Sequence, residues 1–569
     1  MPLASFGQES SSLGLPDWSV LVGYLLLTSV LGAKLAGRQA TIRDFFLGGR
    51  RLPWWAICGS IVATEISSAT LIAVPVTAFV TGGNLGYLQL AIGAIIARVI
   101  VGYLFVPRYY EHEIYSPYDY MGRQMGQGVR KVTTGLFFVG AILGQGARLY
   151  ITAFVLSAIA GIDLISAIWV MGLFGVAWTL MGGITTVIWT DVIQFGVLML
   201  GAVCALFVAT SAVPGGVSTV VEEARNAEKF TVFDLSTDLS LPYTLWCGLI
   251  ATPFLNLAAL GTDQVMAQRM FCCRSRTDAR KAIIVSSLAI LVPVLMLLVG
   301  VTLFVFFRAS PFTPREQALY DANPTYLLPI FILRGVPPGL RGLIVAAVMA
   351  SALSTLDSAL AALAQTSYSA FIADRPASRR RRTSWIAKRF SDELLLSKAL
   401  VVGWGVVLCA FASLCILIAR QYQNAIDLAL ALVGYTYGPL LGIFMLAFLR
   451  AGIDHSGLVW AVPLTVLTVF GVSQHDLSVT LSAGFSVDFS NVIVWGAAIG
   501  FLGLGLRKLG GDLGRIAALA VGVVVMVLLH QMRVGVDQDG AAKYLAYTWT
   551  YPIGALMTFG LGYSMAKRR

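Results

Sequence analysis

A carboxylate and several hydroxyl side chains stand in the middle of an apolar segment near the N-terminus. The segment runs from Pro53 to about Val80, and its centre reads GSIVATEISSATLIAVP, with Glu65 as the carboxylate. A charged group inside a membrane span is costly, so it usually faces a partner or a water-filled cavity. A helix that breaks here, ahead of Pro75, would free backbone carbonyls that can bind a cation. The pattern favours a discontinuous helix with a binding site over ordinary hydroxyl contacts between helices.

A second polar cluster reads SALSTLDSAL over residues 351–360. Four hydroxyls share one helix face at i, i+3, i+4 and i+7 spacing: Ser351, Ser354, Thr355 and Ser358. Asp357 stands among them. Hard cations prefer oxygen ligands, and we extend this preference from divalent ions to sodium. The alternative is a face of small residues whose serines bond back to their own helix, but Asp357 fits that alternative poorly.

Two further charged residues fall inside apolar segments. Asp191 lies in GGITTVIWTDVIQF, where it either joins a binding site or answers the positive end of a helix dipole. Arg148 lies in the middle of an apolar run, and its planar fork suits a carboxylate. It either binds a carboxylated substrate or pairs with Glu65. Arg98 is nearer the end of its segment, and we expect it to extend toward the membrane surface.

The elements that position these residues are apolar segments long enough to cross a bilayer. The chain of 569 residues is 57% hydrophobic and 12% charged, with a mean hydropathy of +0.79. A spanning helix needs about 20 apolar residues. The composition predicts an all-α polytopic membrane protein with about 13–15 transmembrane helices. The candidate spans are 17–37, 53–80, 84–108, 133–160, 163–181, 187–212, 243–262, 282–307, 341–371, 398–419, 425–449, 457–473, 491–506, 514–531 and 549–565.

The positive charge is distributed as in a membrane protein. Most of the 40 lysines and arginines fall in alternate loops between the spans, which predicts an N-terminus outside and a C-terminus in the cytoplasm. The run SRRRR at 378–382 would then face anionic lipid of the plasma or inner membrane. Because no basic soluble domain accompanies the net charge of +11, we expect no nucleic-acid partner.

No motif points to catalysis. The seven cysteines have no metal-binding or redox spacing, and no HExxH, Walker or GxSxG element occurs in a suitable context. A membrane enzyme would need a nucleophile with a base, or a metal cluster, and neither is recognisable. The sequence therefore predicts a protein that is not an enzyme, and it gives no sign of an obligate protein partner.

Taken together, the motifs resemble the sodium:solute symporter family, which includes sodium/glucose, sodium/proline, sodium/monocarboxylate and sodium/sialic acid symporters. The resemblance covers roughly residues 17–450. Its markers stand in family order: DFFLGGRRLPWW (44–55), the break at Glu65, MGGITTVIWTDVIQ (181–194), GTDQVMAQR (261–269), SALSTLDS (351–358) and YGPLLGIF (437–444).

The resemblance implies a LeuT-like core of two inverted five-helix repeats with broken helices. The repeats would be residues 53–212 and 243–449. Residues 1–37, an outer tail and first helix, and residues 450–569, the last transmembrane helices, would be peripheral. The substrate would bind near the midplane between the broken helices.

The resemblance also implies where sodium, the coupling ion, binds. The first site would use the carbonyls of Ala63, Ile66 and Ser351 and the side chains of Ser354 and Thr355. Some members hold a second sodium, for which the matching residues are Asp191, Ser354, Asp357 and Ser358. Asp357 replaces a serine of the two-sodium members, so a protonated carboxylate or an altered geometry is possible there.

Several residues match positions that contact substrate in relatives. Ser67, Thr70, Gln89 and Asn256 fall on ligand-contacting positions of sugar or sialic acid symporters. Arg148 lies near an arginine that binds carboxylate in a sialic acid symporter, and Glu65 falls where the proline symporter has an aspartate. Ala259 replaces the aromatic inner gate of a galactose transporter, which weakens the sugar interpretation.

The implied function is sodium-coupled symport of a small organic solute. An unpaired Arg148 would favour a carboxylate such as a monocarboxylate or sialate. Free side chains at both Arg148 and Glu65 would favour an amino acid, and a pair between them would leave a neutral site suited to sugars. A sensor that binds solute without transporting it is the remaining alternative. The carboxylate symporter is the interpretation that we favour.

Overall fold

The structure is a computed structural model that is helical almost throughout. The ranges that it describes are 13–35, 42–111, 114, 116–373, 393–418, 425–449, 455–473, 478–480, 486–509, 512–536 and 542–566. The run SRRRR at 378–382 lies outside them. The N-terminal part of the chain forms α1 (Leu15–Leu35), α2 (Ile42–Leu47), α3 (Trp54–Glu65), α4 (Ser68–Phe79), α5 (Leu90–Ile100), α6 (Val106–Tyr110), α7 (Pro117–Met125), α8 (Gln127–Ala160), α9 (Leu164–Ser211) and α10 (Gly216–Asn226).

The remaining helices continue the bundle, and two short hairpins join the last of them. The helices are α11 (Thr252–Leu257), α12 (Gln264–Phe271), α13 (Arg276–Val285), α14 (Leu291–Ala309), α15 (Pro314–Ala322), α16 (Leu327–Gly335), α17 (Leu340–Tyr368), α20 (Glu393–Ile418), α21 (Ala425–Phe448), α22 (Leu458–Ser473), α23 (Phe489–Lys508), α24 (Leu513–Gln531) and α25 (Thr550–Ser564). The antiparallel pairs are β1 (Ser478–Thr480) with β2 (Ser486–Asp488), and β3 (Gly535–Val536) with β4 (Ala542–Lys543).

Most of the predicted spans form helices of membrane-spanning length, whereas the others are shorter helices. Among the described residues, 10 helices are long and apolar enough to cross a bilayer, and α3 with α4 makes an eleventh as one bent span. Three shorter apolar helices occupy Cys247–Thr262, Leu432–Phe448 and Leu458–Ser473. The predicted spans 163–181 and 187–212 are both parts of α9, which turns at Gly183, where φ is +55°. A Cβ there would lie 2.4 Å from the carbonyl oxygen of Phe45, so only glycine fits.

The predicted discontinuity is the junction of α3 and α4, whose axes differ by 59°. Ile66 and Ser67 are extended, with ψ of 103° and 163°. The N–H of Ile66 makes the last helical bond, to Val62. Pro75 lies inside α4, so the break precedes the proline by more than two turns. Carbonyls at the end of α3 are thus left without helical donors.

Helix α17 lies at the centre of the bundle, between α9, α8, α20 and α1. The apolar stretch of its span is 94% buried, far more than any other span. Small residues permit this position because they let neighbouring backbones approach closely. A Cβ on Gly201 of α9, for example, would lie 2.3 Å from the Cβ of Ala347. The serine-rich cluster of residues 351–360 is therefore held in the protein interior rather than against lipid.

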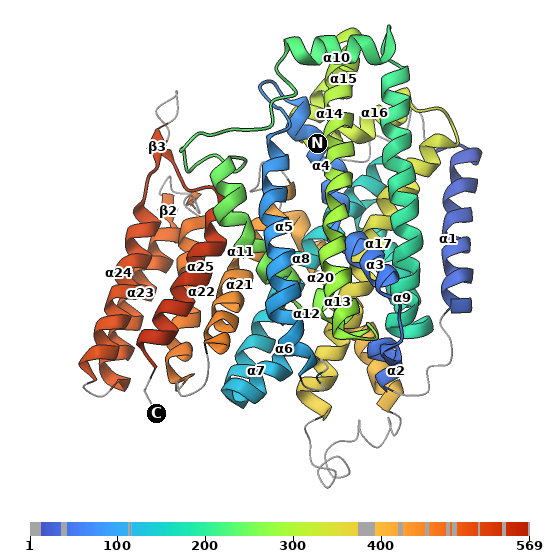
Figure 1. Cartoon of the computed structure of the whole chain (residues 1–569). Coiled ribbons are helices and arrows are strands. Elements are labelled where there is room, and N and C mark those ends of the chain that lie inside the picture. The colour runs from blue at the N-terminus through green and yellow to red at the C-terminus, as the bar shows by residue number, and fades with distance from the viewer. Residues whose placement is uncertain are drawn as a thin grey trace.

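The last helices form a separate group. Figure 1 shows α22 to α25 together on one side of the bundle and α1 on the opposite side. α22, α23, α24 and α25 have a small hydrophobic core of their own, and α25 joins them to α21. This peripheral position was expected, whereas the two hairpins between these helices were not.

A buried lysine fastens the C-terminal end of α4. Lys229 lies in the loop after α10 and is 1% exposed. Its Nζ donates to the carbonyls of Ala78 and Val80 at 2.9 and 2.6 Å and lies 4.1 Å from the centre of the Phe304 ring. Burial lowers the pKa of Lys229 to about 8. A cation at this position also interacts favourably with the negative, C-terminal end of the α4 dipole.

Asp17 of α1 fixes the start of α17. Its Oδ1 accepts hydrogen bonds from the backbone N–H groups of Gly339 and Gly342 at 2.7 and 2.9 Å, and its Oδ2 accepts from Gly14 at 3.0 Å. The carboxylate is fully buried. We expect Asp17→Ala to lower the free energy of unfolding by about 1–3 kcal/mol, because buried donors lose their acceptor. Thermal unfolding in detergent measures this, with Glu222→Ala on the exposed face of α10 as the control. Equal unfolding temperatures for the two variants would contradict this role.

Candidate functional site

A cavity of about 230 Å³ lies beside the break between α3 and α4. Its walls come from the break, α5, α8, α11 and the turn before α14. The polar groups on these walls include most of the predicted substrate-binding residues: Glu65, Ser67, Thr70, Arg148 and Asn256. The structure thus brings these five predicted residues together around one cavity, and their role in substrate binding stays a prediction.

Gln89 does not line this cavity. Its Nε2 donates to the carbonyls of Gly86 and Tyr243 at 3.2 and 2.9 Å, and its Oε1 accepts from the backbone N–H of Asp234 at 3.0 Å. The side chain is 1% exposed. All of its amide atoms thus bond the backbone, and Gln89 fastens the loop that precedes α11 to the start of α5.

Glu65 pairs with Arg98, which corrects the expectation for that arginine. Arg98 is 2% exposed and does not extend to the membrane surface. Its Nη2 donates to Oε2 of Glu65, its Nε to Oγ of Ser286 at 3.1 Å, and its Nη1 to the carbonyl of Ala94 at 3.0 Å. A buried guanidinium needs a carboxylate and several acceptors, and this site provides them. A mid-membrane acid with no partner in its own segment is the signal that could have indicated the pair.

Arg148 lines the same cavity from α8 and is only partly buried. In the described part of the chain, no carboxylate lies within ion-pair distance of Arg148. Glu65, the expected alternative partner, pairs with Arg98. Asp263 interacts with Arg148 electrostatically, but its own oxygens accept from Tyr437 Oη and from the backbone N–H of Val265, both at 2.7 Å. The alternative in which Arg148 neutralises Glu65 is therefore excluded in this structure.

The proposed first sodium residues meet where α17 passes the end of α3. The Ser351 hydroxyl donates to the carbonyl of Ile66 at 2.7 Å. The Thr355 hydroxyl lies 2.9 Å from the carbonyl of Ser351 and 3.5 Å from that of Thr64. Ala63, buried one turn before Ile66, completes this end of α3. Carbonyl and hydroxyl oxygens from two helices thus face one another, and such oxygens suit a hard monovalent cation.

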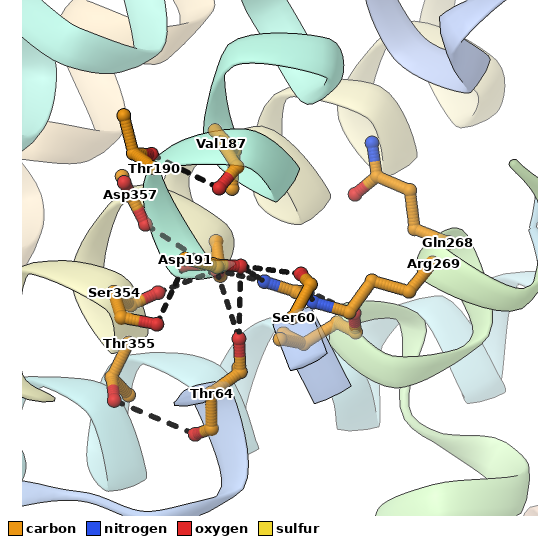
Figure 2. Close-up of polar contacts among 12 residues, drawn as sticks. Ser60, Thr64, Val187, Thr190, Asp191, Gln268, Arg269, Ser354, Thr355 and Asp357 are labelled. Carbon is orange, nitrogen blue, oxygen red and sulfur yellow. Dashed lines mark hydrogen bonds and ion pairs between the residues drawn. The ribbon is translucent and has the colours of Figure 1, made fainter. Parts of the chain in front are cut away.

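Ser354 turns toward Asp191 instead, in a fully buried charged centre drawn in Figure 2. Its hydroxyl donates to Oδ1 of Asp191 at 2.6 Å, and the hydroxyls of Ser60 and Thr64 donate to Oδ2 at 2.5 and 3.4 Å. Nη2 of Arg269 lies 2.9 Å from the same Oδ2, and neither charged side chain is exposed. Asp191 therefore lies in the interior of α9 within a buried network of an ion pair and hydroxyls, away from the helix N-terminus where a dipole would favour it.

Arg269 was not predicted to be part of any site. It falls between the predicted spans 243–262 and 282–307, but it lies on α12 and is fully buried. Its Nε donates to Oγ of Ser60 at 2.8 Å, its Nη1 to the carbonyl of Val265 at 2.7 Å, and its Nη2 also contacts Oγ of Ser358. The sequence signal that could have indicated its role in the buried centre was its position at the end of the GTDQVMAQR motif.

Asp357 lies beside this centre. Its Oδ1 accepts from the Ser358 hydroxyl at 3.3 Å, while its buried Oδ2 has no hydrogen-bond partner among the described residues. The four residues matched to a second sodium thus come together, but the guanidinium of Arg269 already bonds Asp191 and Ser358. A second sodium at this centre stays a prediction.

The comparisons with known proteins agree with this architecture. The model of the sodium:solute symporter family matches residues 45–464. The chain is 26% identical to sodium-coupled monocarboxylate transporter 2 of Bos taurus, over 82% of this chain and 73% of the relative. It is 29% identical to the sodium/sialic acid symporter SiaT of Proteus mirabilis, over 80% of this chain and 89% of the relative.

A solved structure gives the same fold. The substrate-bound, outward-open state of a sodium-coupled sialic acid symporter superposes with a TM-score of 0.72, at 23% identity, over 98% of this chain and 99% of that one. The family match spans most of the chain, including the break, the cavity and the buried charged centre. The protein is therefore an integral membrane protein that belongs to the sodium:solute symporter family and couples a small solute to sodium.

Proposed function

We propose that the protein imports a small organic carboxylate together with sodium. The observation that carries this proposal is the cation at Arg148, which lines the cavity while Arg98 neutralises Glu65. The cavity thus has an unbalanced positive charge in a region of low dielectric, where a charge without a partner is costly. Two relatives, a sodium-coupled monocarboxylate transporter and a sodium/sialic acid symporter, support an acidic substrate.

Neutral and zwitterionic substrates fit these charges less well. A sugar would leave the Arg148 guanidinium without an anion. An amino acid would bring an ammonium group, but Glu65, the one carboxylate among the described residues of the cavity wall, is already paired with Arg98. A carboxylate offers the planar, bidentate partner that a guanidinium prefers.

Sodium would bind next to the substrate. The proposed ligands are the carbonyls of Ala63, Ile66 and Ser351 and the hydroxyls of Ser354 and Thr355. Glu65 and Ser67, which flank Ile66, both line the cavity. Sodium bound at Ile66 would fix the extended backbone of the break and so place these two side chains for the substrate. Binding of either solute then favours the other, as coupled transport requires.

Transport would follow from rocking of one group of helices against another around this site. The N-terminus would lie outside and the C-terminus in the cytoplasm. Each sodium that enters across 100 mV supplies about 2.3 kcal/mol for accumulation of substrate. No covalent step is needed, so the protein would not be an enzyme.

Thermal stability of the purified protein tests the substrate class. A ligand that binds only the folded state raises the unfolding temperature. Acids, amino acids and sugars are each added in sodium and in potassium, and we expect a shift from acids in sodium alone. Arg148→Met should weaken acid binding by about tenfold to a hundredfold, since a charge-assisted bond contributes about 1.5–3 kcal/mol. The shift caused by sodium alone should remain.

The exposed Arg276→Met at the start of α13 is the matched control and should bind acids like the wild type. Full acid affinity in Arg148→Met would assign that arginine a structural role and contradict the proposal. A shift from sugars alone would also contradict it. Acid binding without uptake into proteoliposomes would indicate a sensor instead of a transporter.

A further inference from the structure

Glu65 presents a second oxygen to the cavity. Only Oε2 contacts Arg98, and in the described part of the chain no hydrogen bond is formed by Oε1. The side chain is 25% exposed although it ends a helix in the middle of the bundle. Because Glu65 lines the cavity, this exposure is to the space in which the substrate would bind.

Arg98 orients this carboxylate rather than competing for the substrate. Each of its three guanidinium nitrogens bonds the protein, at Ser286, at the carbonyl of Ala94 and at Glu65. At 2% exposure it offers the cavity almost no surface. The pair therefore acts on the cavity mainly through the free oxygen of Glu65, which is a strong hydrogen-bond acceptor.

Beside the neutral polar side chains of the cavity wall, two charged residues on different helices offer opposite hydrogen-bonding chemistry. Arg148 on α8 offers donors, and Glu65 on α3 offers an acceptor. A carboxylate with a purely hydrocarbon remainder would cover Glu65 and leave its oxygen without water or a donor, which is unfavourable. A hydroxyl group on the substrate would satisfy this acceptor without adding a charge, whereas an ammonium group would add one to a pair that is already neutral.

We propose that the preferred substrate is a carboxylate that also carries a hydroxyl group. Its carboxylate binds Arg148, and its hydroxyl donates to Oε1 of Glu65. This inference rests on the proposed function and adds Glu65 as the residue that sets specificity. Sites built to bond a hydroxyl discriminate strongly against analogues without one, because their own polar group is then left unpaired.

Matched pairs of acids test the inference. Dissociation constants are measured in sodium for lactate and propionate, and for 3-hydroxybutyrate and butyrate, with alanine as the ammonium analogue. The wild type should bind the hydroxy acid of at least one pair about tenfold or more tighter than its partner. Equal affinities within both pairs, or a preference for alanine, would overturn the inference and leave the carboxylate proposal intact. Binding of none of the four acids would overturn the inference, while the acid panel of the thermal-stability test decides the carboxylate proposal separately.

The double variant Glu65→Leu with Arg98→Met locates the effect. Removing both charges together avoids a stranded buried ion, which a single substitution would leave. The readout is the ratio of the two dissociation constants within a pair, so a general change in affinity cancels. The ratio should fall toward one. A ratio as large as that of the wild type would show that Glu65 does not bind the hydroxyl group of the substrate. Should this variant not fold, the ratio in the wild type still decides.

Discussion

Arg269→Met should yield a protein that does not fold stably in the membrane. The guanidinium is fully buried and bonds Asp191, Ser60 and the carbonyl of Val265. Without it, Asp191 keeps a buried charge with no cationic partner, and the carboxyl group of Asp357 lies beside it (Figure 2). Breaking a buried pair by removing one partner typically costs about 3–5 kcal/mol.

The recovery of monodisperse protein after solubilisation, together with its unfolding temperature, measures this loss. Arg269→Lys keeps the charge but loses the planar guanidinium with its several donors, so its stability should be intermediate. Adding Asp191→Asn to Arg269→Met should recover part of the stability, because the partner then carries no charge. An Arg269→Met protein as stable as the exposed Arg276→Met control would show that the buried pair contributes nothing.

The same pair shows what the sequence could and could not predict. Asp191 was recognised because an acid inside an apolar run stands out. Arg269 was not, because it lies seven residues beyond the predicted span 243–262, in a stretch that leads on to Arg274, Arg276 and Arg280. Hydropathy sets the depth of a residue in the membrane, but it does not tell which way a side chain turns at the end of a helix.

The sequence could not identify the partner of Glu65, for a related reason. Both Arg98 and Arg148 lie inside apolar segments, and either could have reached it. Only the packing of α5 against the break, with Ser286 and the carbonyl of Ala94 ready to bond the guanidinium, selects Arg98. Local pattern cannot choose between two arginines whose helices it does not place in space.

The architecture was more accessible because lipid imposes strict conditions on the backbone. Apolar length predicted most of the helices, and the hydroxyls around Glu65 located the break to within a residue or two. The bend of 59° and the burial of α17 depend on contacts between distant segments. So does the position of Gln89, whose partners Tyr243 and Asp234 are about 150 residues away in the chain.

Sodium dependence should be lost when the hydroxyls of Ser354 and Thr355 are both removed. Ser354→Ala with Thr355→Val takes away two of the five proposed ligands, and carbonyls alone cannot replace the hydration shell of the ion. The unfolding temperature should then be equal in sodium and potassium. Uptake of the cognate acid into proteoliposomes should no longer respond to a sodium gradient. Because Ser354 also bonds Asp191, part of the loss in stability will be independent of sodium.

Thr366→Val provides the matched control on the same helix. Thr366 is buried on α17, three turns beyond Thr355, and in the described part of the chain its hydroxyl has no hydrogen-bond partner. This variant should keep the sodium response. Sodium-driven uptake that survives in the double variant would place the coupling site elsewhere. Acid affinity should also fall in the double variant, since Glu65 and Ser67 flank the proposed ligand Ile66. Unchanged acid affinity together with a lost sodium response would mean that the break does not carry the coupling between the two solutes.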